Sequence, residues 1–511
     1  MRTGLVALAL SILSALGCGK SGSSGSSGSV TDAGMQGDAG TGPCDPMQGS
    51  YFVATTGSDA AAGTRDAPFL TIQHALDVAE AGAVVVVGGG VYHELVEFPR
   101  SGTTGAPIVL RGACGTRPVI DGTGLGGGIG EAALVRIVDR AFVTVQGFEL
   151  RGLTGSGGNF PAGVWVRGGS HDVRIAHNVV HGIAAQNGGN GSGAHGIAVY
   201  GTTTTPVERV TIEGNELYGL LLGWSEAVVV NGNVRDFAVT ANLVHDVDNI
   251  AFDFIGFEAD VCPSCTQDDV TNVADVNRVR SGTVVGNVAH HVTSNGNPAY
   301  GSERSAGCFY VDGGADLVIE RNVAHHCDLG VELASEHYGK STRGVVLRNN
   351  FLYQNDVTGL ATGGYSSGTG AGGGSTTGCV IVGNTISDSS RNGWANAGIF
   401  LQSRNVGNVF ANNIVVASAG GDCVAVGGSM NSGNVFDRSV YSGGAVSGVS
   451  GGANSITADP RLVDPTNGDL HLGPGSPAID AGDASLGDPG AVDIDGQPRQ
   501  VGALDIGADE R

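Results

Sequence analysis

The sequence predicts an all-β protein, a right-handed parallel β-helix with a short capping helix at its N-terminal end. Short β-branched runs recur between about 160 and 430, and an asparagine returns at intervals of 27 to 45 residues. Glycine contributes 89 of the 511 residues, yet 41% are hydrophobic, which indicates a folded but turn-rich chain. The strands are not separated by helical patterns of about 10 to 15 residues, which argues against separate α/β units. A repeating unit at such intervals is typical of a solenoid.

Each predicted rung has a first strand, a second strand that ends in asparagine, and a short third strand. Stacked asparagine amides can donate to and accept from the rungs above and below, which satisfies buried polar groups at a sharp turn. β-branched residues fill the interior, because parallel strands bury one face completely. The asparagines are Asn178, Asn215, Asn242, Asn287, Asn322, Asn350, Asn384 and Asn413.

The first strand of each rung is placed by counting from these asparagines. Its first and third residues should point inward, and its second and fourth outward. The strands begin at Val164, Ile197, Val228, Ile250, Phe309, Val331, Leu360 and Ile399. Their second positions include Trp165, Tyr310 and Glu332. Their fourth positions include Arg167, Tyr200, Asp253 and Asp312.

The open end of such a solenoid needs a cap. The segment Thr71–Ala79 follows Pro68 and places its apolar residues at the spacing of a short amphipathic helix. We expect this helix to lie across the first coil.

The N-terminal segment indicates export. Residues 1–18 place Arg2 before an apolar run that is too short to span a bilayer. Residues Ala15 to Cys18 resemble a bacterial lipobox, which implies lipidation of Cys18 and a membrane anchor; the alternative is a plain signal peptide with an incidental cysteine. Residues 19–46 are a Gly/Ser-rich tether. We expect an extracytoplasmic protein, either an outer-membrane or cell-surface lipoprotein or a secreted one.

Charge limits the partners. The formal net charge is -23, and no cluster of lysine and arginine could neutralise a run of phosphates, so we expect no nucleic acid partner. An acidic surface also repels uronate polymers, which would need a bound cation or a local basic patch. We expect a monomer.

Eight further cysteines follow Cys18, and in an exported protein these can form disulfides whose pairing the sequence does not give. Cys262 and Cys265 form a CxxC motif that could be a redox or half-zinc motif, but no second CxxC and no histidine pair at zinc-ligand spacing accompanies it. We therefore favour a local disulfide.

Acidic residues gather on three consecutive rungs. The predicted register stacks Asp253 and Asp312 about 5 Å apart, with Glu332 on the next rung and Glu336 just beyond. Carboxylates this close repel, so one must be protonated, paired or bound to metal. An ordinary solvated acidic face is the alternative. The longest loops, 254–280 and 292–306, lie beside these rungs, which favours a functional site.

The block from YFVATTGSD to PVIDG, within residues 51–122, resembles the cap and first rungs of right-handed β-helix proteins that include polysaccharide lyase family 9 pectate lyases. The resemblance implies the fold. In that family the calcium site includes a box close to Asp-Asp-Gly-x-Asp, and of the matching segment Asn249–Asp253 only Asp253 fits. Pectate lyase activity is therefore not carried over.

Two further segments carry resemblances. The strings VDNIAFDFIGFE, NPAYGSERSAGCFYVDGG and LGVELASEHYGKST, within about 245–345, are similar to uncharacterised secreted bacterial β-helix proteins. Residues 458–510 resemble the choice-of-anchor Q region behind bacterial surface β-helices, and its aspartates could bind calcium or close Asp-Gly turns. The expected division is therefore a β-helix over 47–455 and a C-terminal region over 456–511.

Two enzyme mechanisms and one non-enzymatic role follow. In the first, Asp253, Asp312 and Glu332 hold Ca²⁺ on an acidic polysaccharide, and Lys340, Arg304 or His337 removes the proton for β-elimination. In the second, two carboxylates hydrolyse glycosidic bonds. The third is a surface protein that binds glycan without turnover. The residues expected to contact polysaccharide are Trp165, Arg167, Tyr200, Tyr310 and Glu336.

Overall fold

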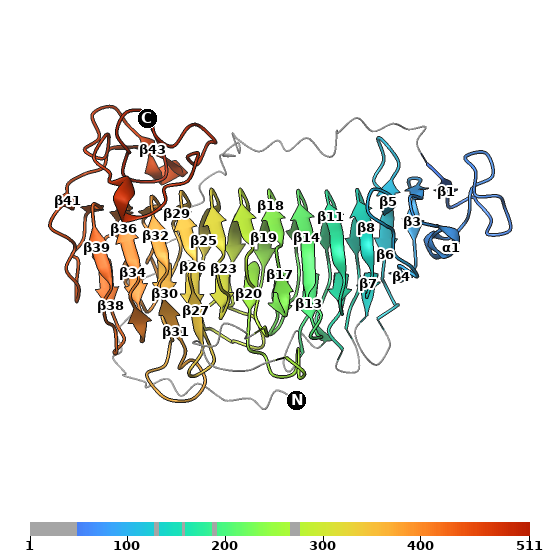
Figure 1. The fold of residues 1–511 in the computed structure, drawn as a ribbon, viewed down its shortest axis with the longest axis horizontal. Coiled ribbons are helices and arrows are strands. Elements are labelled where there is room, and N and C mark those ends of the chain that lie inside the picture. Colours follow the sequence, from blue (N-terminus) through green and yellow to red (C-terminus); the bar gives the residue numbers. More distant parts are fainter. Residues whose placement is uncertain (1–48, 127–131, 156–158, 187–191, 266–275) are drawn as a thin grey trace, which may run out of the picture. The chain divides into compact units, whose positions relative to one another are not determined.

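The computed structural model describes residues 49–126, 132–155, 159–186, 192–265 and 276–511, all within one compact unit, Asp38–Arg511. Three long parallel sheets form the walls of a right-handed parallel β-helix (Figure 1). We call these sheets A, B and C. Along the chain, each rung passes through one strand of sheet C, then one of sheet A, then one of sheet B. The predicted fold class is confirmed.

Sheet C contains the predicted first strands, and its inward residues belong to the main core. Phe252 and Phe309, for example, stack on adjacent rungs with their ring centroids 4.9 Å apart. The strands are β4 (Val96–Glu97), β7 (Ala133–Val138), β10 (Ala162–Arg167), β13 (His195–Gly201), β16 (Val228–Gly232), β20 (Phe252–Ile255), β23 (Gly307–Asp312), β26 (Leu329–Ala334), β30 (Thr358–Thr362), β34 (Ala397–Leu401) and β38 (Asp422–Val426).

Sheet A contains the second strands, which lead into the asparagine turn. They are β1 (Tyr51–Val53), β2 (Val84–Val87), β5 (Ile108–Gly112), β8 (Ala141–Gln146), β11 (His171–Ala176), β14 (Val207–Glu213), β17 (Val234–Arg235), β18 (Ala238–Thr240), β21 (Thr283–Val285), β24 (Val318–Glu320), β28 (Val346–Arg348), β32 (Val380–Val382), β36 (Val409–Ala411) and β39 (Val435–Asp437).

Sheet B contains the short third strands. They are β3 (Val91–Tyr92), β6 (Val119–Asp121), β9 (Glu149–Arg151), β12 (Val179–His181), β15 (Glu216–Tyr218), β19 (Leu243–Val247), β22 (Val288–Val292), β25 (Val323–Cys327), β29 (Phe351–Tyr353), β33 (Thr385–Ser387), β37 (Ile414–Val416), β40 (Val440–Ser442) and β41 (Ile456–Thr457). A small sheet beside sheet C joins β27 (Ser341–Arg343), β31 (Ser375–Thr377) and β35 (Asn405–Val406).

The predicted asparagine ladder is confirmed along its whole length. From Asn178 to Asn384, each Nδ2 donates to the Oδ1 of the next asparagine at 2.8 to 3.1 Å. The same Oδ1 also accepts the backbone N–H of the preceding asparagine, as between Asn287 and Asn322 at 2.8 Å. The ladder ends where the backbone N–H of Asn413 donates to Ser439 Oγ. Each buried amide is thus satisfied by its neighbours.

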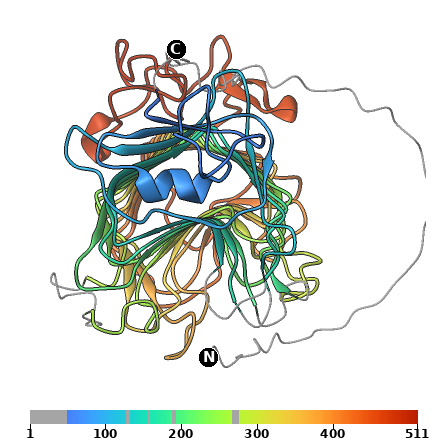
Figure 2. The same cartoon turned by 90° about the vertical axis from the view of Figure 1, so that its right-hand side faces the viewer.

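The cap also forms as predicted. Helix α1 (Ile72–Val78) begins at Thr71, whose hydroxyl accepts the His74 N–H, and buries Ile72, Ala75 and Leu76. Two more of its N-terminal N–H groups donate to the Glu94 carboxylate. The end view shows α1 lying across the first coil (Figure 2).

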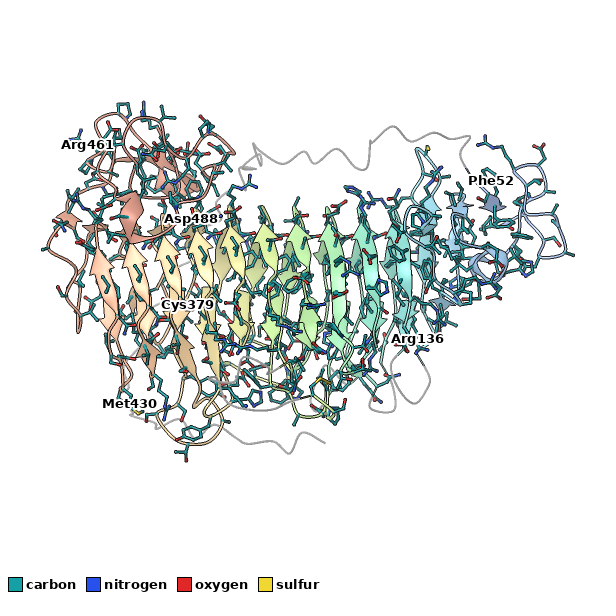
Figure 3. The ribbon with its side chains drawn as sticks, in the orientation of Figure 1. Phe52, Arg136, Cys379, Met430, Arg461 and Asp488 are labelled. Atoms are coloured by element: carbon teal, nitrogen blue, oxygen red, sulfur yellow. A yellow bond between two sulfur atoms is a disulfide. The ribbon has the colours of Figure 1, made fainter. Side chains whose placement is uncertain are left out.

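The residues after β41 pack against the outer face of sheet B. They include β42 (Leu462–Asp464), β43 (Asp469–Leu472) and the 3-10 turns η2 (Pro465–Asn467) and η3 (Ala484–Leu486). Leu472, Ala478 and Ile506 contact Ile414 and Val440 in one apolar cluster. Asp488 lies beside the solenoid, where it pairs with Arg348 at 2.6 Å (Figure 3).

Aspartates of this region accept backbone N–H groups: Asp493 closes a local turn, and Asp505 and Asp509 join segments that lie apart in the sequence. Asp493 Oδ1 accepts the N–H groups of Asp495 and Gln497, and Asp505 Oδ1 accepts that of Asp480. Asp509 Oδ2 accepts the Leu472 N–H.

The predicted local disulfide between Cys262 and Cys265 is present. A second disulfide joins Cys308 in β23 to Cys327 in β25, while Cys379 and Cys423 are buried thiols. Cys18 lies outside the described residues, so its lipidation stays a prediction. No helix within the described ranges is long and apolar enough to cross a membrane.

Replacing Asn322 by alanine should lower the free energy of unfolding by about 3 kcal/mol, because buried donors on Asn287 lose their acceptor and each such loss costs about 1–3 kcal/mol. Urea unfolding followed by circular dichroism measures the change. Asn295→Ala is the matched control, since that side chain is exposed in a loop. Equal unfolding midpoints for the two variants would contradict the ladder's contribution.

Candidate functional site

The candidate site lies on the outward face of sheet C, but its register differs from the prediction by two residues at β20. Phe252 pairs with Val228 and Phe309, so Asp253 aligns with Val229 and Tyr310, and Tyr310 aligns with Glu332. Asp312 lies one outward position further along its strand. The predicted direct stack of Asp253 on Asp312 is therefore wrong. Because Ile250 and Phe252 are both apolar, alternation alone does not distinguish the two registers.

Five carboxyl side chains nevertheless gather here, and together we call them the acidic centre: Glu226, Asp253, Asp312, Glu332 and Glu336. Asp253 is 2% exposed, and its Oδ1 has no hydrogen-bond partner in the described part of the chain. Burial raises the pKa of Asp253 well above its usual value, and the nearby charges of Glu226, Asp312 and Glu336 raise it further. Burial and the acidic neighbours of Asp253 therefore favour its neutral form.

Glu332 lies two rungs from Asp253, with Tyr310 between them. Burial raises the pKa of Glu332 to about 7, although Gln402 Nε2 donates to its Oε1 at 2.9 Å and favours the charged form. Tyr310 is 5% exposed, and burial with four surrounding acids raises the pKa of its phenol. Asp253 and Glu332, whose pKa values are both raised, thus lie on either side of the Tyr310 phenol.

Asp312 fastens a loop over the end of the strands. Its Oδ1 accepts the Glu336 N–H at 2.7 Å, just past the end of β26. The same loop carries His337 and Lys340, two of the three bases predicted from the sequence. Asp312 therefore positions this loop beside the acidic centre.

Lys340 and His337 meet at the ring of Phe257. Lys340 Nζ lies 4.9 Å from the Phe257 ring centroid, and Arg278 Cζ lies 4.8 Å from it. His337 contacts the ring at its edge, and its Nε2 lies 3.9 Å from Glu258 Oε1. Lys340, Arg278 and His337 thus surround one buried phenylalanine. Two of them, Lys340 and His337, belong to the loop that carries Glu336.

Arg304, the third predicted base, lies where the strands of sheet C begin, whereas Lys340 lies where they end. It precedes β23 and pairs with Asp328 at 3.4 Å and with Asp356 at 2.5 Å. Lys340 follows β26, and in parallel strands the start and the end of each strand lie at opposite edges. The structure therefore does not bring Arg304 to the acidic centre.

Three residues predicted to contact sugar form a packed cluster on earlier rungs. Trp165 is only 3% exposed, its ring lies 5.4 Å from that of Tyr200, and Arg167 lies over it at 5.7 Å. His195 links this cluster to the acidic centre, because its Nε2 contacts the Tyr200 hydroxyl at 3.3 Å and its Nδ1 lies 3.7 Å from Glu226 Oε2. In this arrangement Trp165 offers no open face to a sugar.

The exposed aromatic residues are ones the sequence analysis missed. Trp224 contacts Tyr300 with ring centroids 5.0 Å apart, at the edge where β16 begins. Tyr338 and Tyr365 are 52% and 54% exposed and lie beyond the ends of β26 and β30. Burial of its hydroxyl and the charges of Glu336, Asp312 and Glu332 raise the pKa of Tyr365. Exposed aromatic rings therefore lie at both edges of the sheet.

Glu226 was also missed. It sits two residues before β16, so the strand pattern did not place it on the outward face. The string Trp224-Ser225-Glu226 in front of a buried strand was the available signal.

The three predicted calcium ligands are not assembled into one site. Among the described residues, the one group of three histidine, cysteine or carboxylate side chains whose donor atoms all lie within 4.8 Å is His471, Asp495 and Asp509. The orphaned oxygen of Asp253 suits a hard cation. Calcium therefore stays a prediction.

Comparison with known proteins agrees with the fold. Residues 51–211 match the family described as Pel9A-like, right-handed β-helix region. The uncharacterized protein YwoF of Bacillus subtilis is 34% identical over 455 residues, which cover 84% of this chain and 92% of YwoF. Pectate lyase PEL9 of Emericella nidulans is 38% identical over 106 residues, 20% of this chain and 26% of that protein. The crystal structure of GH136 lacto-N-biosidase from Eubacterium ramulus has a TM-score of 0.51 at 13% identity over 78% of this chain and 67% of that one, a likeness of fold alone.

Fold and matches together define a pectate-lyase-like right-handed β-helix protein. The likeness to YwoF extends over most of both chains, and the chain belongs to the YwoF family. The Pel9A-like match ends at residue 211, before the acidic centre begins at Glu226. The matched part is thus the cap and the early rungs, and the acidic centre lies outside it.

The raised pKa of Glu332 predicts a pH-dependent contribution to stability. The folded protein keeps a proton on Glu332 up to about pH 7, whereas the unfolded chain releases it near the ordinary glutamate pKa of 4.5, so this stabilisation is lost as the pH rises from 4.5 through 7. We expect Glu332→Gln to reduce the loss of stability between pH 5 and pH 8 by roughly 2 kcal/mol, since one pKa unit is about 1.4 kcal/mol and the side chain is partly exposed. Urea unfolding at both pH values measures this. An unchanged difference between the two pH values would contradict the raised pKa.

Proposed function

We propose that the protein is an exported enzyme that acts on polysaccharide at the outward face of sheet C, with the acidic centre as its reacting group. The pair of Asp253 and Glu332 carries this proposal. Their Cα atoms are two rungs apart, about 10 Å at the usual spacing between strands. Inverting glycoside hydrolases hold their two carboxyl groups about 6.5–9.5 Å apart, which leaves room for a water molecule beside the sugar.

The two environments assign different roles to the pair. Asp253, neutral because of burial and its acidic neighbours, is the general acid that gives its proton to the leaving oxygen. Glu332 has a pKa of about 7 and is the general base that takes a proton from the attacking water. Water adds to the anomeric carbon as the glycosidic bond breaks, so the proton count balances with one proton lost by Asp253 and one gained by Glu332.

The exposed aromatic residues support a long, chain-like substrate. Trp224 lies before β16 and Tyr338 and Tyr365 lie after β26 and β30, so a glycan that crosses the acidic centre would meet aromatic rings on both sides. Aromatic rings pack against the apolar faces of sugars. The net charge of -23 favours a neutral glycan over a polyuronate at this site unless a cation is bound.

Cation-assisted β-elimination is the second candidate, and the orphaned Oδ1 of Asp253 within a group of five carboxyl groups favours it. A bound Ca²⁺ would neutralise this group and hold a uronate carboxylate. Lys340, beside Phe257, would then be the base that takes the proton next to that carboxylate. The partial match to a pectate lyase supports the same substrate class.

We expect Asp253→Asn and Glu332→Gln each to lower turnover at least 100-fold, because each removes one member of the proton-transfer pair. Purified protein is incubated with neutral and acidic polysaccharides, and new reducing ends are counted. Asp388→Asn is the control, since Asp388 lies on a turn of sheet B and pairs with Arg391. Binding without turnover on any glycan would sink the enzyme proposal and leave a glycan-binding surface protein.

The two reactions differ in product and in ion dependence. Hydrolysis yields reducing ends without ultraviolet absorbance, and a chelator does not change it. Elimination yields unsaturated uronate that absorbs in the ultraviolet, requires added Ca²⁺, and is lost in Lys340→Met. Absorbing products from the wild type would replace the hydrolytic assignment with elimination.

A further inference from the structure

A column of aromatic rings lies on the outward face of sheet B, on a different wall from the acidic centre. One ring from each of six successive rungs stacks on the next, with centroids 4.8 to 5.2 Å apart. The rings belong to His181, Tyr218, His245, His290, His325 and Tyr353. The column explains the recurring histidines as members of a stack.

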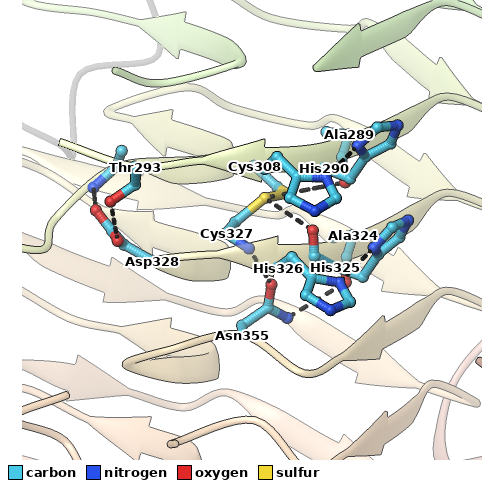
Figure 4. Close-up of a disulfide and its surroundings, with 12 residues drawn as sticks. Ala289, His290, Thr293, Cys308, Ala324, His325, His326, Cys327, Asp328 and Asn355 are labelled. Atoms are coloured by element: carbon cyan, nitrogen blue, oxygen red, sulfur yellow. Dashed lines mark hydrogen bonds between the residues drawn. A yellow bond between two sulfur atoms is a disulfide. The ribbon is translucent and has the colours of Figure 1, made fainter. Parts of the chain in front are cut away.

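On two adjacent rungs a second histidine follows the first. His291 and His326 stack on each other with ring centroids 5.1 Å apart, so four rings form two pairs, one above the other. Figure 4 shows His290 on one rung and His325 and His326 on the next. Within the pairs, Nδ1 of His290 lies 2.7 Å from Nδ1 of His291, and Nδ1 of His325 lies 2.8 Å from Nδ1 of His326. We call these four residues the histidine patch. Eight ring nitrogens are thus concentrated on two rungs.

The second histidines occupy a backbone position that does not favour them. His291 and His326 have φ values of 52° and 54°, in the left-handed region. At the same place on earlier rungs stand Gly182 and Gly219, which adopt it without a penalty, whereas a side chain there costs roughly 1 kcal/mol or more. The hydrogen bonds that join His291 to His290 and His326 to His325, and the stack of His291 on His326, offset part of this cost.

Other side chains at this position all make contacts. Asp246 Oδ2 lies 2.7 Å from His245 Nδ1, and Gln354 Nε2 donates to the Thr466 carbonyl in the C-terminal region. The rung below the patch thus repeats its geometry with a carboxylate in place of an imidazole. Both groups are ligands for transition-metal ions.

The spacing within each pair suits two ligands of one ion. Imidazole nitrogens bind divalent transition metals at about 2.0–2.1 Å, so two neighbouring ligands of one ion lie about 2.9–3.3 Å apart. The observed 2.7 and 2.8 Å are a few tenths of an ångström shorter, a difference that a small ring rotation removes. His291 and His326 are exposed, and an ion can reach them from solvent.

We propose that the histidine patch, His290, His291, His325 and His326, binds a divalent transition-metal ion of the Cu²⁺, Ni²⁺ or Zn²⁺ class. Each pair supplies two adjacent nitrogens. Stacking of the pairs brings the second pair within one rung of the first, so ring rotation can add a third or fourth imidazole. This site is separate from the acidic centre, and it does not depend on the proposed enzymatic activity.

Copper binding tests the proposal with a readout of the ligands themselves. We expect the full chain to bind Cu²⁺ saturably in calorimetry, and its electron paramagnetic resonance spectrum to show nitrogen couplings from imidazole. The double variant His291→Gly/His326→Gly should weaken binding at least 30-fold and lose these couplings. It should still fold, because glycine suits the left-handed position and stands there on earlier rungs.

Two controls separate the patch from its surroundings. Gln354→Gly introduces glycine at the same turn position without removing an imidazole, and His181→Gln alters the same column of rings where no second ligand follows. Both should bind copper within twofold of the wild type. Copper binding that persists in the double glycine variant, or the absence of saturable binding in the wild type, would overturn the proposal.

Discussion

The whole structure depends on one constraint: the backbone of each parallel strand hydrogen-bonds to the strand one rung away, so side chains at equivalent positions form columns. Where successive rungs carry the same residue type at one position, those side chains stack. Inside, it stacks Phe252 on Phe309 and runs an asparagine ladder from Asn178 to Asn413. Outside, it stacks imidazoles on sheet B and brings carboxyl groups together on sheet C. The same spacing is favourable for amides and rings and unfavourable for like charges.

The repulsion between closely spaced carboxyl groups determines the chemistry of the acidic centre. A carboxylate in water would ionise near pH 4, but burial raises the pKa of both Asp253 and Glu332, and the charges of neighbouring acids raise both further. A stable scaffold can hold such an unfavourable group because the ladder and the core fix the strands on either side. Structural polar groups in the ladder satisfy one another, whereas Asp253 Oδ1 has no hydrogen-bond partner among the described residues. A buried, titratable group on a sheet whose two edges carry exposed aromatic residues is typical of sites that act on a ligand.

The two sequence matches cover different parts of the chain. The Pel9A-like match covers the cap and early rungs. The acidic centre and the histidine patch lie further along the chain, beyond this match. Membership of the YwoF family extends the likeness over most of the chain, and it links this protein to a relative whose own activity is not described. The chemistry of this protein therefore has to be argued from its own side chains.

The sequence by itself determined the solenoid, the eight ladder asparagines, the helix α1 and the disulfide between Cys262 and Cys265, because each follows from local pattern or from a period along the chain. It also placed Tyr310, Glu332 and Asp312 on the outward face. Only the tertiary structure decided which columns these residues join. A shift of two residues preserves the alternation of apolar and polar positions, so the register of Asp253 was open. Residues before or after a strand, such as Glu226 and Arg304, reach an edge of the sheet through turns whose direction no period encodes, and the contact of His290 with His291 depends on a backbone angle at one turn.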